Sequence, residues 1–178
     1  MLFIRRVFCS RHQVCAAATR GNDVASRFAR NEFHKVQKLV PGVYEAIDDM
    51  STAIKASGIS AEYLELAKIR SSQMNGCAQC LGIHLNEARK MGMDPHKLEL
   101  IPVWREAGIY DDREMAVLNW AERLTDLAGH EIDDAAFAAI NSYFNETEVA
   151  ALSFAIAQIN FYNRLGAVYH YTPPRYRP

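Results

Sequence analysis

Apolar residues recur at helical spacing along most of this chain, and this spacing constrains the fold more than any other feature of the sequence. One stripe follows Asp111-Asp112 at i, i+3, i+4, i+7, i+10 and i+11: Val117, Trp120, Ala121, Leu124, Leu127 and Ala128. A second follows Asn145: Val149, Leu152, Ile156 and Ile159. No alternating run of β-branched residues bounded by turns accompanies them. We therefore predict an all-α fold.

Start and stop signals divide the chain into separate helices. Ser60 and Asp94 are of the residue types that cap helix starts, and Pro41 and Pro95 suit a first helical turn. Asn75-Gly76 provides a break. The predicted segments are 41–56, 60 to the break at 75–76, 77–90, 95–106, 112–128, 133–142 and a last one from 145 onward.

The bulk composition is that of one compact domain. Of 178 residues, 49% are hydrophobic and 23% charged, and no stretch approaches the roughly 18 apolar residues of a membrane helix. Beyond residue 30 the net charge is −6, without a basic stripe interleaved with aromatics. We therefore expect no membrane span and no nucleic-acid partner.

Residues 1–30 form a leader of different composition. It holds six Arg and one acid, a net charge of +5, mixed with apolar and small residues. This predicts a mitochondrial transit peptide and a matrix location, otherwise a cytoplasmic one; a disordered extension or a misread upstream start codon is the alternative. Residues 31–178 are then a single helical domain.

The chain also contains a weak internal repeat. At an offset of 85, residues 39–75 match residues 124–160 at eight of 37 positions. Ser60 and Asn145, both predicted caps, coincide in this register. We predict two related helical units, at about 33–92 and 111–171, of which the second lacks the chemical residues described next.

The chemistry concentrates in Cys77-x-x-Cys80-x-x-x-His84, with Glu65 on the preceding helix. On a helix, residues at i, i+3 and i+7 share a face. A helix start, an imidazole and a second thiol each lower the pKa of a thiol. Glu65 could orient His84 as a base, and the two thiols could form a disulfide. Because Cys9 and Cys15 lie in the leader, this pair would be alone in a reducing compartment, either redox-active or metal-binding.

Two other interpretations stay open at this point. The cysteines could be small buried hydrophobes, with His84 a satisfied core residue and Glu65 a solvated acid, in a non-catalytic oligomeric helical module. Two Cys, one His and a carboxylate could also ligate zinc, in a Cys/His metal-binding protein.

The motif resembles the alkylhydroperoxidase D-like core of the carboxymuconolactone decarboxylase superfamily. Glu65-x11-Cys77-x2-Cys80-x3-His84 carries the resemblance, which extends over roughly residues 33–171. Similar later segments are 103–106, 113–125 and 159–165. Gln79 replaces a His of the family's best-known peroxidases, Tyr162 stands where many relatives have Trp, and the motif lies in the first half of the chain.

The resemblance implies an all-helical, homo-oligomeric protein with thiol-dependent peroxidase activity. Cys80 would attack a hydroperoxide, Cys77 would resolve the sulfenic acid to a disulfide, and Glu65 with His84 would relay protons. A dithiol reductant such as a thioredoxin-like or lipoyl protein would reopen the bond. Neither an organic cofactor nor a metal is expected, nor is decarboxylation, because decarboxylase members lack the cysteine pair.

Overall fold

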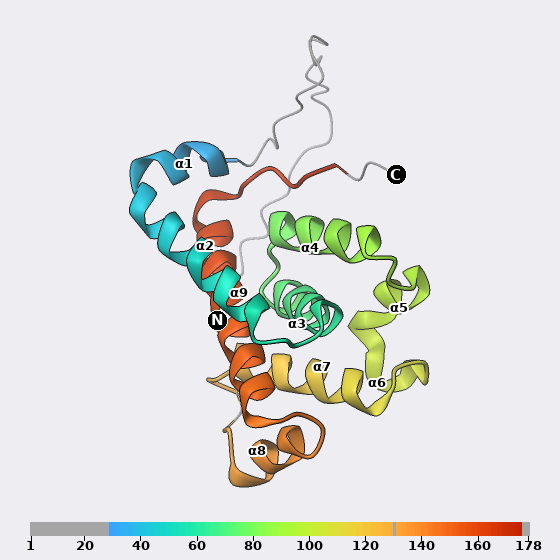
Figure 1. Ribbon diagram of the computed structural model, residues 1–178. Helices are drawn as coiled ribbons and strands as arrows, with labels where there is room; N and C mark the ends of the chain where they lie inside the picture. The colour runs from blue at the N-terminus through green and yellow to red at the C-terminus, as the bar shows by residue number, and fades with distance from the viewer. Residues whose placement is uncertain (1–28, 130, 176–178) are drawn as a thin grey trace, which may run out of the picture.

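The computed structural model describes residues 29–129 and 131–175, and every regular element in this part of the chain is helical (Figure 1). The predicted all-α fold is confirmed; the leader, apart from its last two residues, lies outside the described residues. The elements are α1 (Phe33–Leu39), α2 (Pro41–Ala56), α3 (Ala61–Met74), α4 (Ala78–Lys90), α5 (Pro95–Leu100), η1 (Ile101–Val103), α6 (Trp104–Ala107), α7 (Asp112–Thr125), α8 (Asp134–Asn141) and α9 (Glu146–Tyr169).

Polar caps fix most of the helix starts that the sequence predicts. The Ser60 hydroxyl accepts a hydrogen bond from the Glu62 N–H at the start of α3. Asp111 and Asn145 form reciprocal capping boxes at the starts of α7 and α9. Each such cap satisfies an otherwise unpaired backbone N–H and stabilises its helix by about 1 kcal/mol.

The prediction of one helix over 95–106 is wrong. The chain forms α5, one turn of 3₁₀ helix (η1) and the short α6 instead. Pro102 lies in the middle of η1, and a proline has no N–H with which to continue an α-helical ladder. The segment ends at Gly108, whose φ of +64° is left-handed.

The apolar stripe of α7 is also shorter than predicted. Val117, Trp120 and Ala121 are buried. The helix ends at Thr125, however, and Leu127 beyond it is 64% exposed. Leu127 and Ala128 therefore match the helical spacing in the sequence but lie beyond the end of the helix.

Helix α3 lies at the centre of the molecule and packs against α4, α7 and α9 (Figure 1). Its side chains Leu66 and Ile69 meet Leu118 of α7 and Ile156 of α9 in one buried cluster. Because α3 is covered on several sides, its polar residues Glu65, Ser71 and Ser72 are buried as well. In the described residues no helix is both long and apolar enough to cross a bilayer.

One capping feature recurs at the predicted offset of 85. Ser57 and Ser142 both cap helix ends, and their hydroxyls donate to Ile54 and Ala139 carbonyls at 2.7 Å. Superposition of the two complete units stays a prediction. The units differ at one point: α3 stops at Asn75-Gly76, with φ +66° at Gly76, whereas α9 runs on through the equivalent positions 160 and 161.

Candidate active site

The two cysteines of the motif lie at the first turn of α4. Cys77 is the N-cap residue, and its Sγ accepts a hydrogen bond from the Cys80 N–H at 3.3 Å. A disulfide joins Cys77 and Cys80, whose Cα atoms are 5.4 Å apart. Each residue is only 5% exposed. The structure thus brings together the pair that the sequence singled out, at a helix N-terminus that favours a thiolate.

A network of amides, buried on its α9 side, holds the turn before Cys77. Asn75 Nδ2 donates to Asn160 Oδ1 at 3.0 Å and to Asn163 Oδ1 at 2.9 Å, both on α9. Asn163 in turn donates to the Ser72 hydroxyl, and the Ser72 carbonyl accepts the Cys77 N–H at 3.0 Å. The turn is therefore tied to α9. Asn75 and Asn160 are the last positions of the two matched ranges of the repeat, 39–75 and 124–160, but the repeat does not predict a contact between them.

Helix α9 passes so close to the disulfide that only glycine fits at residue 166. A Cβ at Gly166 would lie 2.5 Å from Cys77 Sγ and 3.8 Å from Cys80 Sγ. Ile159 and Tyr162, also on α9, complete the apolar cover of the two sulfurs. Sequence reasoning missed Gly166 because nothing near it in the chain points to Cys77.

Glu65 and His84 form the second part of the site. Glu65 Oε2 lies 2.7 Å from His84 Nδ1, and Glu65 Oε1 accepts from Lys68 Nζ at 3.0 Å. An ionised carboxylate can only accept, so Nδ1 carries a proton, and Nε2 is an acceptor whenever the ring is neutral. His84 lies one turn after Cys80 on α4. The structure therefore places Glu65, the predicted orienting acid, within hydrogen-bond distance of His84, the predicted base.

The surroundings of Glu65 keep its carboxyl ionised. Burial alone would raise its pKa, but the hydrogen bond and charge of His84, together with Lys68, outweigh burial and hold the pKa below its ordinary value. Lys68 was not among the predicted site residues. Its spacing of three residues from Glu65 on one helix was the signal that could have identified it.

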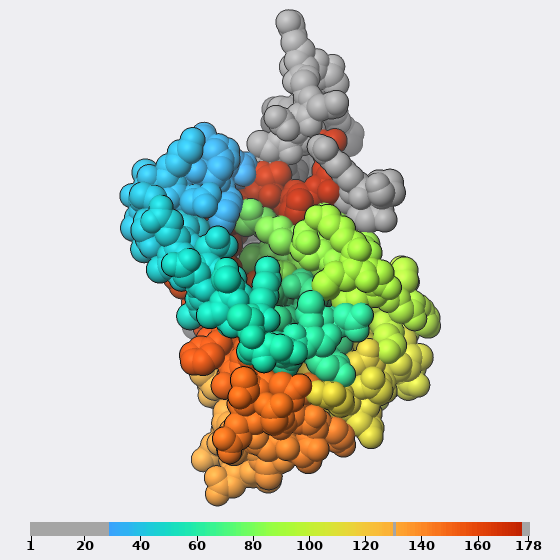
Figure 2. Space-filling model, in the orientation of Figure 1, coloured from blue at the N-terminus to red at the C-terminus, as the bar shows by residue number. Residues whose placement is uncertain are grey.

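The Glu65–His84 pair lines a cavity of about 450 Å³ between four helices. Figure 2 shows the surface hollowed between α2 and α4. The lining residues are Asp48, Ser51 and Lys55 of α2; Ala61, Leu64, Glu65 and Lys68 of α3; His84 and Glu87 of α4; Met91; and Gln158, Ile159 and Tyr162 of α9. Neither cysteine is among these described lining residues. Ile159 and Tyr162 touch both the disulfide and the cavity, so the disulfide and the cavity are neighbours.

One buried amide fixes the α2 wall of this cavity. Gln158 on α9 donates to the Ile47 carbonyl at 2.9 Å and to the Ser51 hydroxyl at 2.8 Å. Both acceptors belong to α2. The shape of the cavity thus depends on a contact between segments more than 100 residues apart.

The C-terminal segment after α9 covers the outer side of α4. It runs between α1 and α4 (Figures 1 and 2). A Cβ at Gly82 would lie 3.1 Å from Pro174 Cδ, and Thr172 donates to Glu32 at 2.7 Å. This segment therefore closes α4 on the side away from the core.

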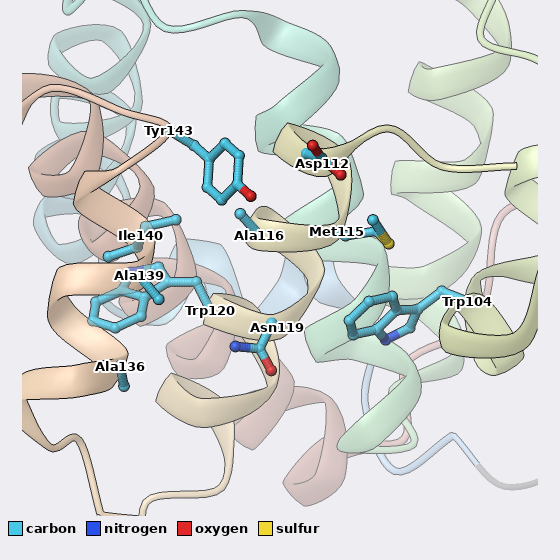
Figure 3. Close-up of a pocket in the computed structure, with 10 residues that line it drawn as sticks. All are labelled: Trp104, Asp112, Met115, Ala116, Asn119, Trp120, Ala136, Ala139, Ile140 and Tyr143. Carbon is cyan, nitrogen blue, oxygen red and sulfur yellow. The ribbon is translucent and has the colours of Figure 1, made fainter. Parts of the chain in front are cut away.

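A second hollow, of about 260 Å³, lies between α6, α7 and α8 (Figure 3). Both tryptophans of the chain line it, but their indole N–H groups are already bonded, Trp104 to Glu122 at 2.9 Å and Trp120 to Ser153 at 3.0 Å. No cysteine or histidine is among its described lining residues. It offers no nucleophile or base comparable with those near α4.

Within residues 29–129 and 131–175, no group of three or more His, Cys, Asp or Glu side chains is arranged to hold a metal ion. The four residues of the motif are instead divided into a disulfide and a Glu–His pair. In the described residues the four side chains are therefore not arranged as the single ligand set that the zinc interpretation requires.

We predict that Lys68→Met raises the pKa of Glu65. The carboxylate then loses one of its two partners, and the loss of a hydrogen bond to a charged group costs about 1–3 kcal/mol at neutral pH. Because the folded-state pKa of Glu65 is depressed, this stability is present above the ordinary value of 4.5 and disappears as pH falls through the folded pKa. Chemical denaturation as a function of pH would show the variant approaching the parent at low pH.

The same substitution should move the acid limb of any Glu65-dependent activity to higher pH. Lys90→Met is the matched control, because Lys90 pairs with Glu87 at the same i, i+3 spacing but at an exposed site. An exposed pair contributes about 0–1 kcal/mol, so this control should change little. Equal pH profiles for Lys68→Met and the parent would contradict the assignment of Lys68.

Fold and site together define a class: an all-helical protein with a Cys-x-x-Cys pair at a helix start and a Glu–His pair beside it. The family model "Carboxymuconolactone decarboxylase family" matches residues 41–123, which include all four residues of the motif. The protein YdfG of Bacillus subtilis (strain 168) is 33% identical over 128 residues, covering 72% of this chain and 87% of YdfG. The chain belongs to the carboxymuconolactone decarboxylase family.

Solved structures show the same fold. ATU0492 of Agrobacterium tumefaciens, described as a candidate antioxidant defence protein AhpD, is 29% identical with a TM-score of 0.77, covering 83% of this chain and 99% of that one. The debrominase Bmp8 is 21% identical with a TM-score of 0.69, covering 78% of this chain and 74% of that one. The fold is thus that of alkylhydroperoxidase D-like proteins, and the predicted resemblance is confirmed at the level of family and fold. Because such a fold also carries debromination, a more specific activity must be argued from the site.

Proposed function

We propose that this protein is a thiol-dependent peroxidase that reduces organic hydroperoxides through Cys80 and Cys77, with Glu65 and His84 as its proton relay. The family and the AhpD-like neighbour support a peroxidase-related function in general terms. One observation supports the specific proposal most. The Glu65–His84 hydrogen bond lies one turn along α4 from the Cys77–Cys80 disulfide and borders a cavity.

In the oxidative half-reaction the reduced Cys80 thiol gives its proton to His84 Nε2, while Glu65 stabilises the resulting imidazolium. The Cys80 thiolate attacks the terminal oxygen of the hydroperoxide, forming an S–O bond and breaking the O–O bond. The leaving alkoxide takes the proton from His84. Cys77 then attacks the sulfenic acid of Cys80, and a disulfide and water are formed.

In the reductive half-reaction an external dithiol attacks Cys80, and Cys77 leaves as the thiolate. Two features support this direction. The Cys77 sulfur accepts the Cys80 N–H at the start of α4, which stabilises a leaving thiolate, and Gly166 closes the space beside it. The second thiol of the reductant resolves the mixed disulfide. A thioredoxin-like or lipoyl protein supplies such a dithiol.

The cavity favours an organic hydroperoxide over hydrogen peroxide. Its volume of about 450 Å³ lies within the range of small-molecule sites. Apolar side chains from two helices line it, Ala61 and Leu64 of α3 and Ile159 and Tyr162 of α9, together with Met91. An alkyl or aryl group can be buried against them, whereas hydrogen peroxide has no apolar surface to bury.

The proposal is tested by the stoichiometry of thiol loss. In a chain with Cys9→Ser and Cys15→Ser, the reduced protein should lose both remaining thiols when one equivalent of cumene hydroperoxide is converted to its alcohol. Thiol titration and chromatography of the alcohol measure the two quantities. A chain that also carries Cys77→Ser and Cys80→Ser should lose the rapid formation of alcohol that accompanies thiol loss. Persistence of free thiols in the parent would refute the mechanism.

The assembly state and cellular location stay predictions. A homo-oligomer would cover apolar side chains that the single chain exposes, such as Phe137 and Phe161. A monomer at micromolar concentration, observed by analytical ultracentrifugation, would contradict the prediction of a homo-oligomer.

A mitochondrial location rests on the composition of residues 1–30 alone. It fails if these residues, fused to a fluorescent protein, leave it in the cytosol.

A further inference from the structure

A methionine continues the reactive face of α4. Cys80, His84, Glu87 and Met91 follow at i, i+4, i+7 and i+11, which is one face of a helix. Met91 is the C-cap residue of α4 and lines the same cavity as His84. Its thioether is therefore a sulfur on the wall of the cavity that the proposed substrate enters.

We propose that Met91 is an oxidation site of this protein, converted to methionine sulfoxide by an organic hydroperoxide bound in the cavity while Cys77 and Cys80 are joined as a disulfide. This inference rests on the proposed function only in that the cavity takes an organic hydroperoxide. The Met91 sulfur attacks the terminal oxygen, an S–O bond forms and the O–O bond breaks. The hydroxyl proton passes to the leaving alkoxide, so the products are the sulfoxide and the alcohol.

The oxidation state of the cysteines decides which sulfur reacts. A free Cys80 thiolate is a far better nucleophile than a thioether and consumes the hydroperoxide first. In the disulfide the two cysteine sulfurs are bonded to each other, and neither is a thiolate nucleophile. Met91 then offers the reactive sulfur on the cavity wall. Oxidation of Met91 would therefore show that the cysteines had been oxidised faster than the dithiol reductant could reduce them.

The chain contains its own matched controls. Met91 is 40% exposed, Met50 is 39% and Met74 is 37% exposed, so oxidation from bulk solvent should affect the three alike. Met50 lines a different hollow, between α2 and α9, and Met74 ends α3. Neither is among the described lining residues of the Glu65–His84 cavity. Any excess oxidation at Met91 therefore reports binding of the hydroperoxide in that cavity.

The experiment treats the full chain, in its disulfide form, with cumene hydroperoxide and follows each methionine by peptide mass spectrometry. Met91 should be oxidised about fivefold or more faster than Met50 and Met74, because the cavity raises the local concentration of the oxidant. With hydrogen peroxide the three rates should be similar. Equal rates at the three sites with cumene hydroperoxide would overturn the proposal.

Two variants separate this inference from the proposed function. Ala61→Trp fills the cavity from α3 and should remove the excess at Met91 while Met50 and Met74 react as before. The Cys77→Ser/Cys80→Ser chain should keep the excess although it cannot turn over. A parent chain that loses no thiols but oxidises Met91 selectively would refute the peroxidase and support this inference. A chain that loses both thiols to the hydroperoxide but shows no selective oxidation of Met91 would support the peroxidase and refute this inference.

Discussion

Replacing Cys80 by serine is expected to abolish the reduction of organic hydroperoxides. Cys80 is the thiol one turn from His84, and a serine hydroxyl does not form the nucleophile at neutral pH. Loss of an enzyme's nucleophile removes most of the catalysis, so we expect kcat/KM to fall by at least about 10³-fold. A coupled assay with cumene hydroperoxide and a dithiol reductant measures this.

Cys77→Ser should behave differently, which makes the two variants a test of roles as well as of activity. Without a resolving thiol, Cys80 can react once and stop as a sulfenic acid, which dimedone traps and mass spectrometry locates. Cys15→Ser, in the leader, serves as the neutral control. Because the α4 N-terminus also favours a thiolate at Cys77, the opposite pattern, with the trapped sulfenic acid on Cys77 of the Cys80→Ser chain, would exchange the two roles.

Gly166→Ala is the second substitution for which we expect a large effect. An alanine Cβ would lie 2.5 Å from Cys77 Sγ, a distance that forces α9 and the first turn of α4 apart. Overpacking of this kind costs about 1–3 kcal/mol of stability. Displacement of the reacting sulfurs should also slow formation of the disulfide by about tenfold or more. Denaturant unfolding and the rate of thiol loss after addition of peroxide measure the two effects.

Gly42→Ala is the matched control for Gly166→Ala. Gly42 is also helical, near the start of α2, and a Cβ there would meet nothing within 4 Å. Its replacement should change stability by no more than about 0.5 kcal/mol and leave the thiol kinetics unaltered. If the two glycine variants behaved alike, the close approach of α9 to Cys77 would have no bearing on the chemistry.

The parts of the fold that local chemistry determines could be predicted from the sequence. Ser60, Asp111 and Asn145 act on backbone groups within three residues, so their effect does not depend on the rest of the chain. Where the prediction of one helix over 95–106 failed, the cause was also local: Pro102 should have been given more weight than the pattern around it. The predicted helix over 112–128 was too long because it included Leu127, and periodicity alone does not show where a helix ends.

The candidate site was predictable to the extent that it is contained in one stretch of chain. Glu65, Cys77, Cys80 and His84 fall within 20 positions, although their catalytic roles stay predictions. Helical geometry places the last three at the start and along one face of α4, and the packing of α3 against α4 across a short break brings Glu65 to His84. Gly166, Tyr162 and Gln158 reach the site from α9, and their place depends on how α9 packs against α2, α3 and α4. Such long-range packing leaves no local signature in a single sequence.

The break at Gly76 has a consequence for how this chain can vary. Because α3 stops there, α4 begins with free N–H groups, and reactive side chains can be placed where these groups act on them. Helix α9 continues through the equivalent position, so its N–H groups at that point are all bonded within the helix. Variation in the first half is therefore restricted by charge and reactivity. In the second half residue 166 is restricted by volume, because a Cβ there would collide with Cys77 Sγ.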